Sequence, residues 1–159
     1  MRHTISVLVE NKFGVLARIS GLFSARGYNI ASLAVSETLD PSVSYMTIVV
    51  EAKDDTILEQ IKKQLNKLID VISVTDFTKK DHVDRELILV KVAIAPKQKA
   101  KLESAVKKFP AKIVKRSASL AIIEIMGDQC QINDALAAFN LFGVKELIRT
   151  GRIAMAIGK

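Results

Sequence analysis

Hydrophobic and polar positions along the first half of the chain follow two periods. Runs of β-branched or alternating apolar residues predict four strands, at 4–10, 29–37, 45–51 and 71–77. Apolar residues at helical spacing predict two amphipathic helices, from Val15 to Phe23 and from Ile57 to Leu68. Gly27 is a plausible stop for the first helix, and Asp54-Asp55 a cap for the second. This order predicts a split βαββαβ unit with four antiparallel strands and two helices on one face.

The second half repeats this order after a polar, charged stretch. Strand patterns cover 86–95, 112–115, 120–126 and 144–149, with a further apolar run at 153–157. Helix patterns follow Pro96 and Asp128. We therefore predict an α+β protein of two ferredoxin-like domains, at 1–77 and 86–159, joined by a linker at 78–85. Each domain leaves a bare sheet face and unpaired edge strands, which favours burial by dimerisation.

Composition indicates a globular protein that binds rather than reacts. Of 159 residues, 49% are apolar and 26% are charged, while a single cysteine rules out an intrachain disulfide. We find no metal-ligand spacing, phosphate loop, dinucleotide fingerprint or nucleophile elbow, and expect neither catalytic residues nor a metal. No signal-peptide pattern or long apolar run is visible, so we expect a cytoplasmic protein without a membrane segment. We expect His3 and His82 at the surface or in the linker, and Cys130 beneath the last helix.

Charge is divided unevenly between the halves. Residues 1–76 hold 8 Lys and Arg against 9 Asp and Glu, whereas residues 77–159 hold 16 against 8. Three interpretations of the basic half remain open, in this order: a solvated helix face, a surface for an acidic protein partner, and a nucleic-acid surface. Nucleic acid is the least favoured, because aromatic residues are few and no recognition-helix motif is visible. The basic residues in question are Lys97, Lys99, Lys101, Lys107, Lys108, Lys112, Lys115 and Arg116.

The segment Glu10–Leu16 carries the most specific chemistry. It places Gly14 at the entry of a helix directly after a strand, where unpaired backbone N–H groups and the helix dipole favour a small carboxylate. Asn11 adds a side-chain amide that can contact the same ligand. The alternative is an ordinary strand-to-helix turn, because glycine is common in turns.

Residues 6–30, SVLVENKFGVLARISGLFSARGYNI, resemble the opening of an ACT domain, more narrowly that of the regulatory (small) subunit family of acetohydroxyacid synthase, or acetolactate synthase. The similarity continues through MTI at 46–48, LEQIKKQLNKL at 58–68, RELILVKV at 85–92 and RTGRIA at 149–154. It covers almost all of residues 1–95, and the C-terminal half more loosely.

This resemblance implies a regulatory subunit without catalysis of its own. It implies a homodimer that binds a branched-chain amino acid, most often L-valine, between two ACT domains, and that activates the catalytic subunit and confers feedback inhibition on it. Thiamine diphosphate, Mg²⁺ and FAD are then expected only on the catalytic subunit. Asn11, Gly14, Val15 and Leu16 match the effector loop, with Val15 and Leu16 supplying backbone N–H groups. Asn29 and Ile30 match the partner chain's side of the pocket.

Two other functions stay open on the sequence alone. One is a free-standing ACT-domain sensor that acts on transcription through its basic half, for which a salt-dependent duplex shift would be the evidence. The other is a small enzyme on a ferredoxin-like scaffold, although no nucleophile and base can be paired in the sequence.

Overall fold

The computed structural model describes residues 1–52 and 55–158, so the expected cap residue Asp54 lies outside the described part. The chain divides into two compact units. One comprises Met1–Val83 together with the segment that begins at Arg152, and the other comprises Asp84–Gly151. Each unit is described below by itself.

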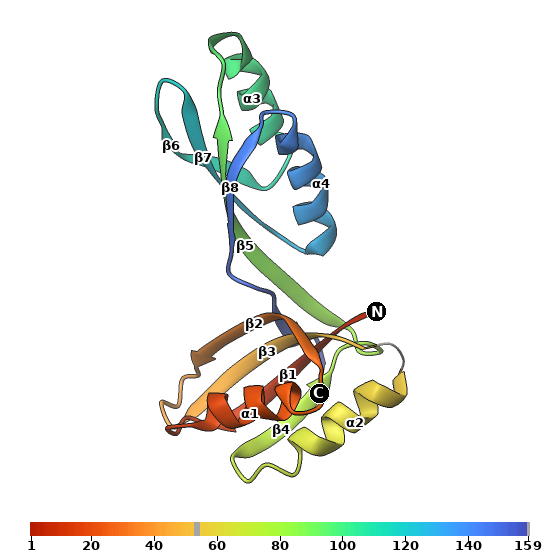
Figure 1. The fold of residues 1–159 in the computed structure, drawn as a ribbon. Coiled ribbons are helices and arrows are strands. Elements are labelled where there is room, and N and C mark those ends of the chain that lie inside the picture. Colours follow the sequence, from red (N-terminus) through yellow and green to blue (C-terminus); the bar gives the residue numbers. More distant parts are fainter. Residues whose placement is uncertain (53–54, 159) are drawn as a thin grey trace. The chain divides into compact units, whose positions relative to one another are not determined.

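The first unit has the predicted βαββαβ order. Its strands pair antiparallel in the order β2-β3-β1-β4, and both helices cover one face of the sheet (Figure 1). Among the described residues, β2 therefore lies at one edge of the sheet, with β3 as its neighbour. The elements are β1 (Arg2–Glu10), α1 (Val15–Ser24), β2 (Asn29–Glu37), β3 (Val43–Glu51), α2 (Asp55–Leu65) and β4 (Val71–Asp76).

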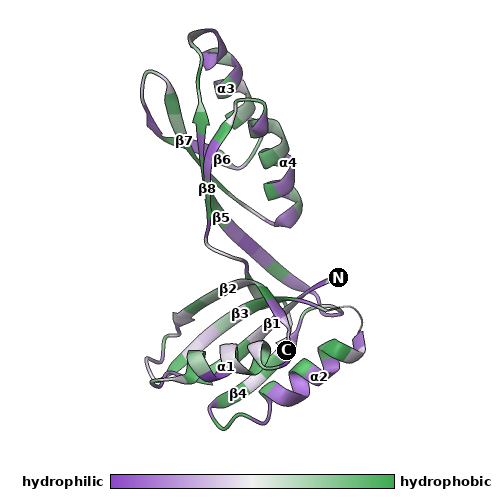
Figure 2. Cartoon of the chain, viewed as in Figure 1, coloured by the Kyte–Doolittle hydropathy of each residue, from purple (hydrophilic) through white to green (hydrophobic). Residues whose placement is uncertain are grey.

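The core of this unit lies between the helices and one face of the sheet. Alternate residues of β1 point into it, and Ile5, Val7 and Val9 have no exposed surface. The helix α2 alternates between polar and apolar residues in Figure 2, and its buried residues lie at the spacing of one helical face. The inward residues of the two helices are Val15, Ile19, Leu22, Phe23, Leu58, Ile61 and Leu65.

The opposite face of this sheet is polar, and residues near the end of the chain form hydrogen bonds with it. The segment that follows Gly151 includes β9 (Ile153–Ala156). The backbone N–H of Arg152 donates to Ser32 Oγ at 3.1 Å, and Tyr45 Oη donates to the carbonyl oxygen of Ala154 at 3.0 Å. Residues 152–158, which the sequence places in the second domain, thus lie in the same compact unit as the first sheet.

The second unit repeats the first in topology. Its sheet has the order β6-β7-β5-β8, with a separate core between the sheet and the helices. Asp128 caps α4 through a reciprocal capping box with Gln131, as predicted for this position. The elements are β5 (His82–Ala93), the 3₁₀ turn η1 (Pro96–Gln98), α3 (Lys99–Val106), β6 (Ala111–Arg116), β7 (Leu120–Gly127), α4 (Gln129–Asn140) and β8 (Val144–Arg149).

Three sequence expectations differ from the structure. The linker expected over 78–85 is shorter, because β5 already begins at His82. His3 is buried rather than at the surface, with Nδ1 3.1 Å from Thr78 Oγ1, because its position on β1 faces inward together with Ile5. Cys130 is exposed, because it lies away from the inward residues of α4, which are Ile132, Ala135 and Phe139.

Candidate functional site

Gly14 makes the transition from β1 to α1. It occupies the N-cap position with φ of 82° and ψ of −4°, a left-handed conformation that costs an L-residue about 1–2 kcal/mol. A Cβ built on Gly14 meets only Arg18 Nη1, at 3.8 Å, among atoms that are not its near neighbours in the chain. The glycine is therefore required for its backbone conformation and not because space is short.

The start of α1 presents backbone N–H groups outside the helical pattern. The first bond of the helix runs from the Arg18 N–H to the Gly14 carbonyl at 3.0 Å, and the Val15 N–H reaches Lys12 O at 3.3 Å. The amides of Leu16 and Ala17 have no partner within residues 1–52 and 55–158. No acidic side chain lies in this first turn. These two amide N–H groups can donate hydrogen bonds to an anion, and the helix dipole favours negative charge at this end.

Asn11 connects the loop before α1 to the turn between β2 and β3. Its Nδ2 donates to Glu37 Oε1 at 3.0 Å and to the Pro41 carbonyl at 2.9 Å, and its backbone N–H donates to Ser42 O at 2.7 Å. The side-chain N–H groups predicted for a ligand are thus engaged within the protein. The carbonyl Oδ1 remains as an acceptor for a ligand.

Val15 and Leu16 differ in burial: the side chain of Val15 packs in the core, whereas that of Leu16 is partly exposed. The side chain of Val15 is 3% exposed and belongs to the core of the first unit. Its backbone N–H, which was predicted to bind the ligand, is bonded to Lys12 O at 3.3 Å, so the next free amide after that of Leu16 is that of Ala17. Leu16 is 45% exposed and provides an apolar surface beside its own free amide. The four residues expected to form the effector loop therefore lie together, as their closeness in sequence requires.

Asn29 and Ile30 lie at the far end of β2. Asn29 is placed opposite Glu51 on β3, while the other end of β2, Glu37, contacts Asn11. Eight steps along an extended strand span about 26 Å at roughly 3.3 Å each. Within one chain, the structure does not bring Asn29 and Ile30 to the Gly14 loop.

Hydrogen bonds already orient the Asn29 side chain. Its Nδ2 donates to Glu51 Oε2 at 3.3 Å, and Arg2 Nε contacts the other oxygen of that carboxylate at 3.2 Å. The Asn29 hydrogen bond, followed by that of Arg2, lowers the pKa of the Glu51 carboxyl. Asn29 consequently keeps its Oδ1 as an acceptor, and Ile30 beside it packs partly against the core.

Charged side chains around the Gly14 loop are paired. Lys12 Nζ lies 2.7 Å from Glu10 Oε2, a hydrogen bond that raises the pKa of the Lys12 ammonium. Arg18 Nη2 lies 2.8 Å from Asp70 Oδ2. Because these cations already have carboxylate partners, the backbone amides of Leu16 and Ala17 remain the candidate groups for an anion at this loop.

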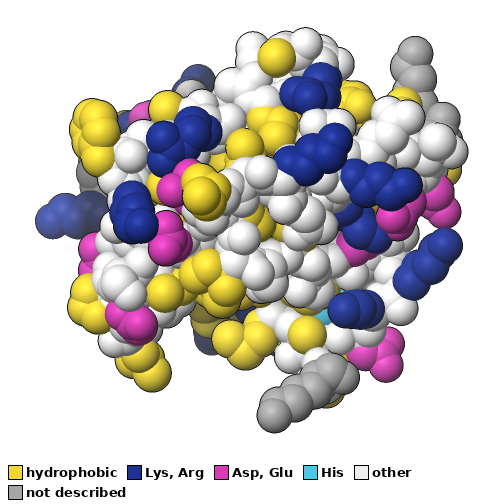
Figure 3. Space-filling model, turned by 90° about the horizontal axis from the view of Figure 1, so that it is seen from below, with side chains coloured by type: hydrophobic (Ala, Val, Ile, Leu, Met, Phe, Trp, Pro, Cys, Tyr) yellow, Lys and Arg dark blue, Asp and Glu magenta, His cyan; other side chains and the backbone are white. Residues whose placement is uncertain are grey.

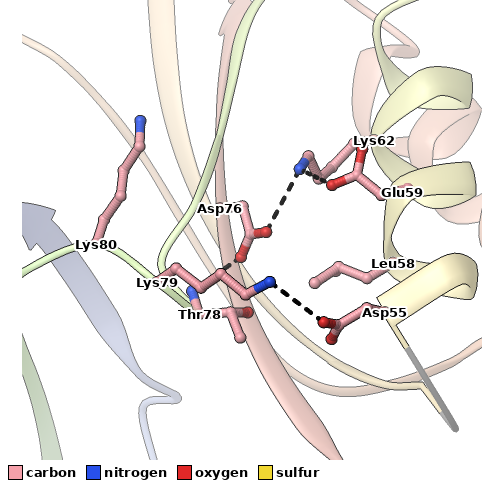
Figure 4. Close-up of a pocket in the computed structure, with 8 residues that line it drawn as sticks. All are labelled: Asp55, Leu58, Glu59, Lys62, Asp76, Thr78, Lys79 and Lys80. Atoms are coloured by element: carbon pink, nitrogen blue, oxygen red, sulfur yellow. Dashed lines mark hydrogen bonds and ion pairs between the residues drawn. The ribbon is translucent and has the colours of Figure 1, made fainter.

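Away from the Gly14 loop, a concavity lies between α2 and the segment that follows β4. It has a volume of about 300 Å³, and acidic and basic side chains that line it form ion pairs (Figure 4). Lys62 pairs with Glu59 and, at 3.4 Å, with Asp76, and Lys79 pairs with Asp55 at 3.4 Å. None of the predicted site residues lines it, and its charges are largely neutralised by one another.

Asp76 is the most buried carboxylate of that concavity. Burial by itself raises the pKa of its carboxyl, but hydrogen bonds from Thr78 and the charge of Lys62 outweigh burial and leave the pKa lower than usual. The pKa of Lys62 is raised, first by its hydrogen bond to Glu59. These groups form a structural ion-pair cluster.

Within the described residues, no group of three His, Cys, Asp or Glu side chains is placed to hold a metal ion. Over the same residues, no helix is long and apolar enough to cross a membrane.

Comparison with known proteins identifies the first unit as an ACT domain, since residues 5–73 match the family described as "AHAS small subunit-like ACT domain". Residues 85–158 match the family "Small subunit of acetolactate synthase". The chain therefore belongs to the acetolactate synthase small-subunit family.

Individual relatives resemble the chain over its full length. It is 47% identical over 158 residues to a probable acetolactate synthase small subunit of Archaeoglobus fulgidus, which covers 99% of this chain and 98% of that protein. It is 39% identical to the acetolactate synthase small subunit of Bacillus subtilis, over 99% and 92% of the two chains. The crystal structure of the acetolactate synthase small subunit from Thermotoga maritima superposes with a TM-score of 0.88 at 36% identity, covering 100% and 99%.

Proposed function

We propose that this chain is the non-catalytic regulatory subunit of acetolactate synthase, which binds L-valine or another branched-chain amino acid and transmits feedback inhibition to the catalytic subunit. In the absence of effector it raises the activity of that subunit. Thiamine diphosphate, Mg²⁺ and FAD belong to the catalytic subunit in this proposal. The observation that carries it is the free pair of amides at Leu16 and Ala17, in a chain similar to small subunits over both units.

The effector pocket lies between two copies of the ACT domain. The carboxylate of the amino acid accepts hydrogen bonds from the Leu16 and Ala17 amides of one copy. The ammonium donates to acceptor oxygens, among which Asn29 Oδ1 of the other copy is available. Leu16 and Ile30 line the pocket with aliphatic surface, which selects a branched aliphatic side chain.

Two features support a dimeric pocket. Asn29 and the Gly14 loop lie at opposite ends of β2, so a single chain cannot supply both halves. In the described part of the chain no strand pairs with the outer edge of β2, and a second copy can satisfy its backbone groups by antiparallel strand addition. Antiparallel pairing of the two β2 strands places the beginning of one strand near the end of the other, and thereby brings Asn29 towards the partner's loop.

Regulation follows from linkage. If valine binds one conformation of the dimer more tightly, and that conformation activates the catalytic subunit less, valine lowers activity. The catalytic subunit must then change valine affinity by the same factor. Similarity of the second unit to small subunits supports this function over a free-standing transcriptional sensor.

The first test is thermal unfolding of the purified chain with L-valine, L-leucine, L-isoleucine and D-valine. A ligand at a hundred times its dissociation constant stabilises the protein by about 2.7 kcal/mol, which raises the midpoint by several degrees. The expected result is a shift with L-valine or another L-amino acid of this class, and none with D-valine.

Reconstitution with the catalytic subunit completes the test. The chain is expected to raise acetolactate formation, and the same L-amino acid to reverse that rise. A chain that neither changes the activity nor binds any of the three L-amino acids in the complex contradicts the proposed function.

A further inference from the structure

Asp70 is a buried carboxylate in the connection between α2 and β4. Its side chain is only 9% exposed, and Arg18 Nη2, on α1, lies 2.8 Å from its Oδ2. Several other ion pairs of the first unit are exposed on both sides, among them that of Arg2 with Glu51. Figure 3 shows basic side chains beside acidic ones at several places on the face that it draws, and exposed pairs contribute little to stability. The pair of Arg18 with Asp70 differs from these, because an ionised carboxylate with little access to water depends on its partner.

Arg18 is joined to Gly14 through both its backbone and its side chain. Its backbone N–H donates to the Gly14 carbonyl at 3.0 Å. Its Nη1 lies 3.8 Å from the position that a Cβ on Gly14 would take. Residues four apart lie on one side of a helix, and helical side chains lean towards its N-terminus, which is why the guanidinium reaches the loop before α1. One end of the guanidinium therefore contacts Asp70, and the other lies beside Gly14.

Asp70 is joined to the same loop through its backbone. Its carbonyl accepts the N–H of Glu10, the last residue of β1, at 2.9 Å. Close by, the pairing of β1 with β4 shifts register between Leu8 and Val9, so that Val71 lies opposite Val9. Irregular pairing of this kind changes the direction of nearby side chains. Asp70 is thus held twice, its backbone by β1 and its carboxylate by α1.

We propose that Arg18 and Asp70 are the positioning pair of the Gly14 loop. They hold the first turn of α1 in the orientation in which the Leu16 and Ala17 amides face the ligand carboxylate. Neither side chain of the pair has to touch the ligand for this role. The role rests on the proposed function, because it takes those two amides as the groups that bind the amino acid.

The start of α1 depends on such a restraint because its N-cap residue provides none. Gly14 has no side chain, and among the described residues no side-chain hydrogen bond caps this helix. At the start of α4, by contrast, the Asp128 carboxylate accepts the Gln131 N–H at 2.8 Å. Amides that are already held in their binding orientation lose little conformational entropy when the ligand binds, which strengthens binding. The pair of Arg18 with Asp70 therefore fixes the start of α1 in place of a capping side chain.

The test titrates the full chain with L-valine, L-leucine and L-isoleucine at a temperature at which every variant is folded. Asp70→Asn keeps the shape of the side chain and removes its charge, and Arg18→Gln removes the guanidinium. Both variants are expected to bind the amino acid ~10-fold more weakly or worse, the factor for loss of one hydrogen bond to a charged group. Arg18→Lys keeps a cation and is expected to bind the amino acid more tightly than Arg18→Gln.

A destabilised variant separates positioning from loss of stability. Leu58 is buried near the start of α2, a helix that follows the end of β3 opposite Arg2 and thus lies away from the Gly14 loop. Leu58→Val removes buried volume, so its melting temperature is expected to fall, whereas its amino-acid affinity is expected to stay within about threefold of the parent.

The outcomes distinguish this role from the proposed function. If Asp70→Asn and Arg18→Gln bind within about threefold of the parent, or if Leu58→Val loses as much affinity as they do, the positioning role is overturned while the proposed function stands. A parent chain that binds none of the three amino acids, alone or with the catalytic subunit, overturns both.

Discussion

Replacement of Gly14 by Asp tests the effector loop most directly. The new carboxylate would lie at the start of α1, where the proposed ligand places its own carboxylate against the Leu16 and Ala17 amides. Two unit charges about 4 Å apart near a protein surface repel by roughly 4 kcal/mol before screening. The expected result is a feedback-resistant enzyme that the subunit still activates.

Arg18, the helix dipole and solvent all reduce this repulsion between the two carboxylates. Arg18 Nη1 lies 3.8 Å from the position of a Cβ on residue 14, so the new carboxylate can pair with it. The helix dipole also favours an acidic group at this end, and solvent screens both charges. We therefore expect a net loss of about 1–2 kcal/mol in valine binding, which corresponds to roughly 5- to 30-fold weaker affinity.

Backbone strain has to be separated from charge. A φ of 82° costs a non-glycine residue about 1–2 kcal/mol, which lowers the melting temperature by several degrees. Gly14→Asn is the control, because Asn has nearly the same shape, tolerates the left-handed conformation and carries no charge. The assay is valine titration of both variants, followed by melting temperature and by activity of the reconstituted enzyme. If Asp and Asn reduce valine affinity equally, the charge argument is refuted; if Gly14→Asp remains fully valine-sensitive, the pocket lies elsewhere.

Three further predictions concern other parts of the first unit. Asn29→Ala is expected to weaken valine binding without reducing the melting temperature of the free subunit by more than a few degrees; an unchanged valine titration removes Asn29 from the pocket. Tyr45→Phe deletes the hydroxyl that holds Ala154 and is expected to cost about 1 kcal/mol of unfolding free energy. In the control Tyr28→Phe, where an exposed hydroxyl lies 3.4 Å from its partner, denaturant titration should find a smaller loss. The pKa of the Asp76 carboxyl is lower in the folded protein than in the unfolded chain, where it is about 3.9. The ionised carboxylate therefore stabilises the fold above about pH 3.9, and this stabilisation is lost as the pH falls through the pKa of the folded protein. Asp76→Asn should therefore lower the melting temperature at pH 7, and its effect should shrink as the pH falls below about 3.9; an effect that does not change with pH would contradict this origin.

Local signals were sufficient for most of the secondary structure. The strands and helices predicted from periodicity agree with the observed ones to within a few residues, and the cap at Asp128 is confirmed by its capping box. Gly14 and Gly27 adopt the positive φ values that turns and helix ends at these positions require. Such features depend on neighbours within a few residues, which is why periodicity and capping rules recover them.

Local sequence patterns did not predict contacts between residues that are distant in the chain. The amide of Asn11 was expected to face a ligand, but it binds a turn about 30 residues further along the chain. Arg152 lies 120 residues from Ser32, and nothing in its local sequence indicates that the end of the chain returns to the first sheet.

The sequence by itself thus determined the two βαββαβ units, the glycine that opens α1 and the family to which the chain belongs, because each is encoded in local pattern or in extended similarity. Only the tertiary structure decided that Asn29 and the Gly14 loop lie at opposite ends of one sheet, and that residues 152–158 belong to the same compact unit as that sheet. These outcomes depend on strand register and on packing between remote segments, where many weak contacts act together and no single residue pattern specifies the result.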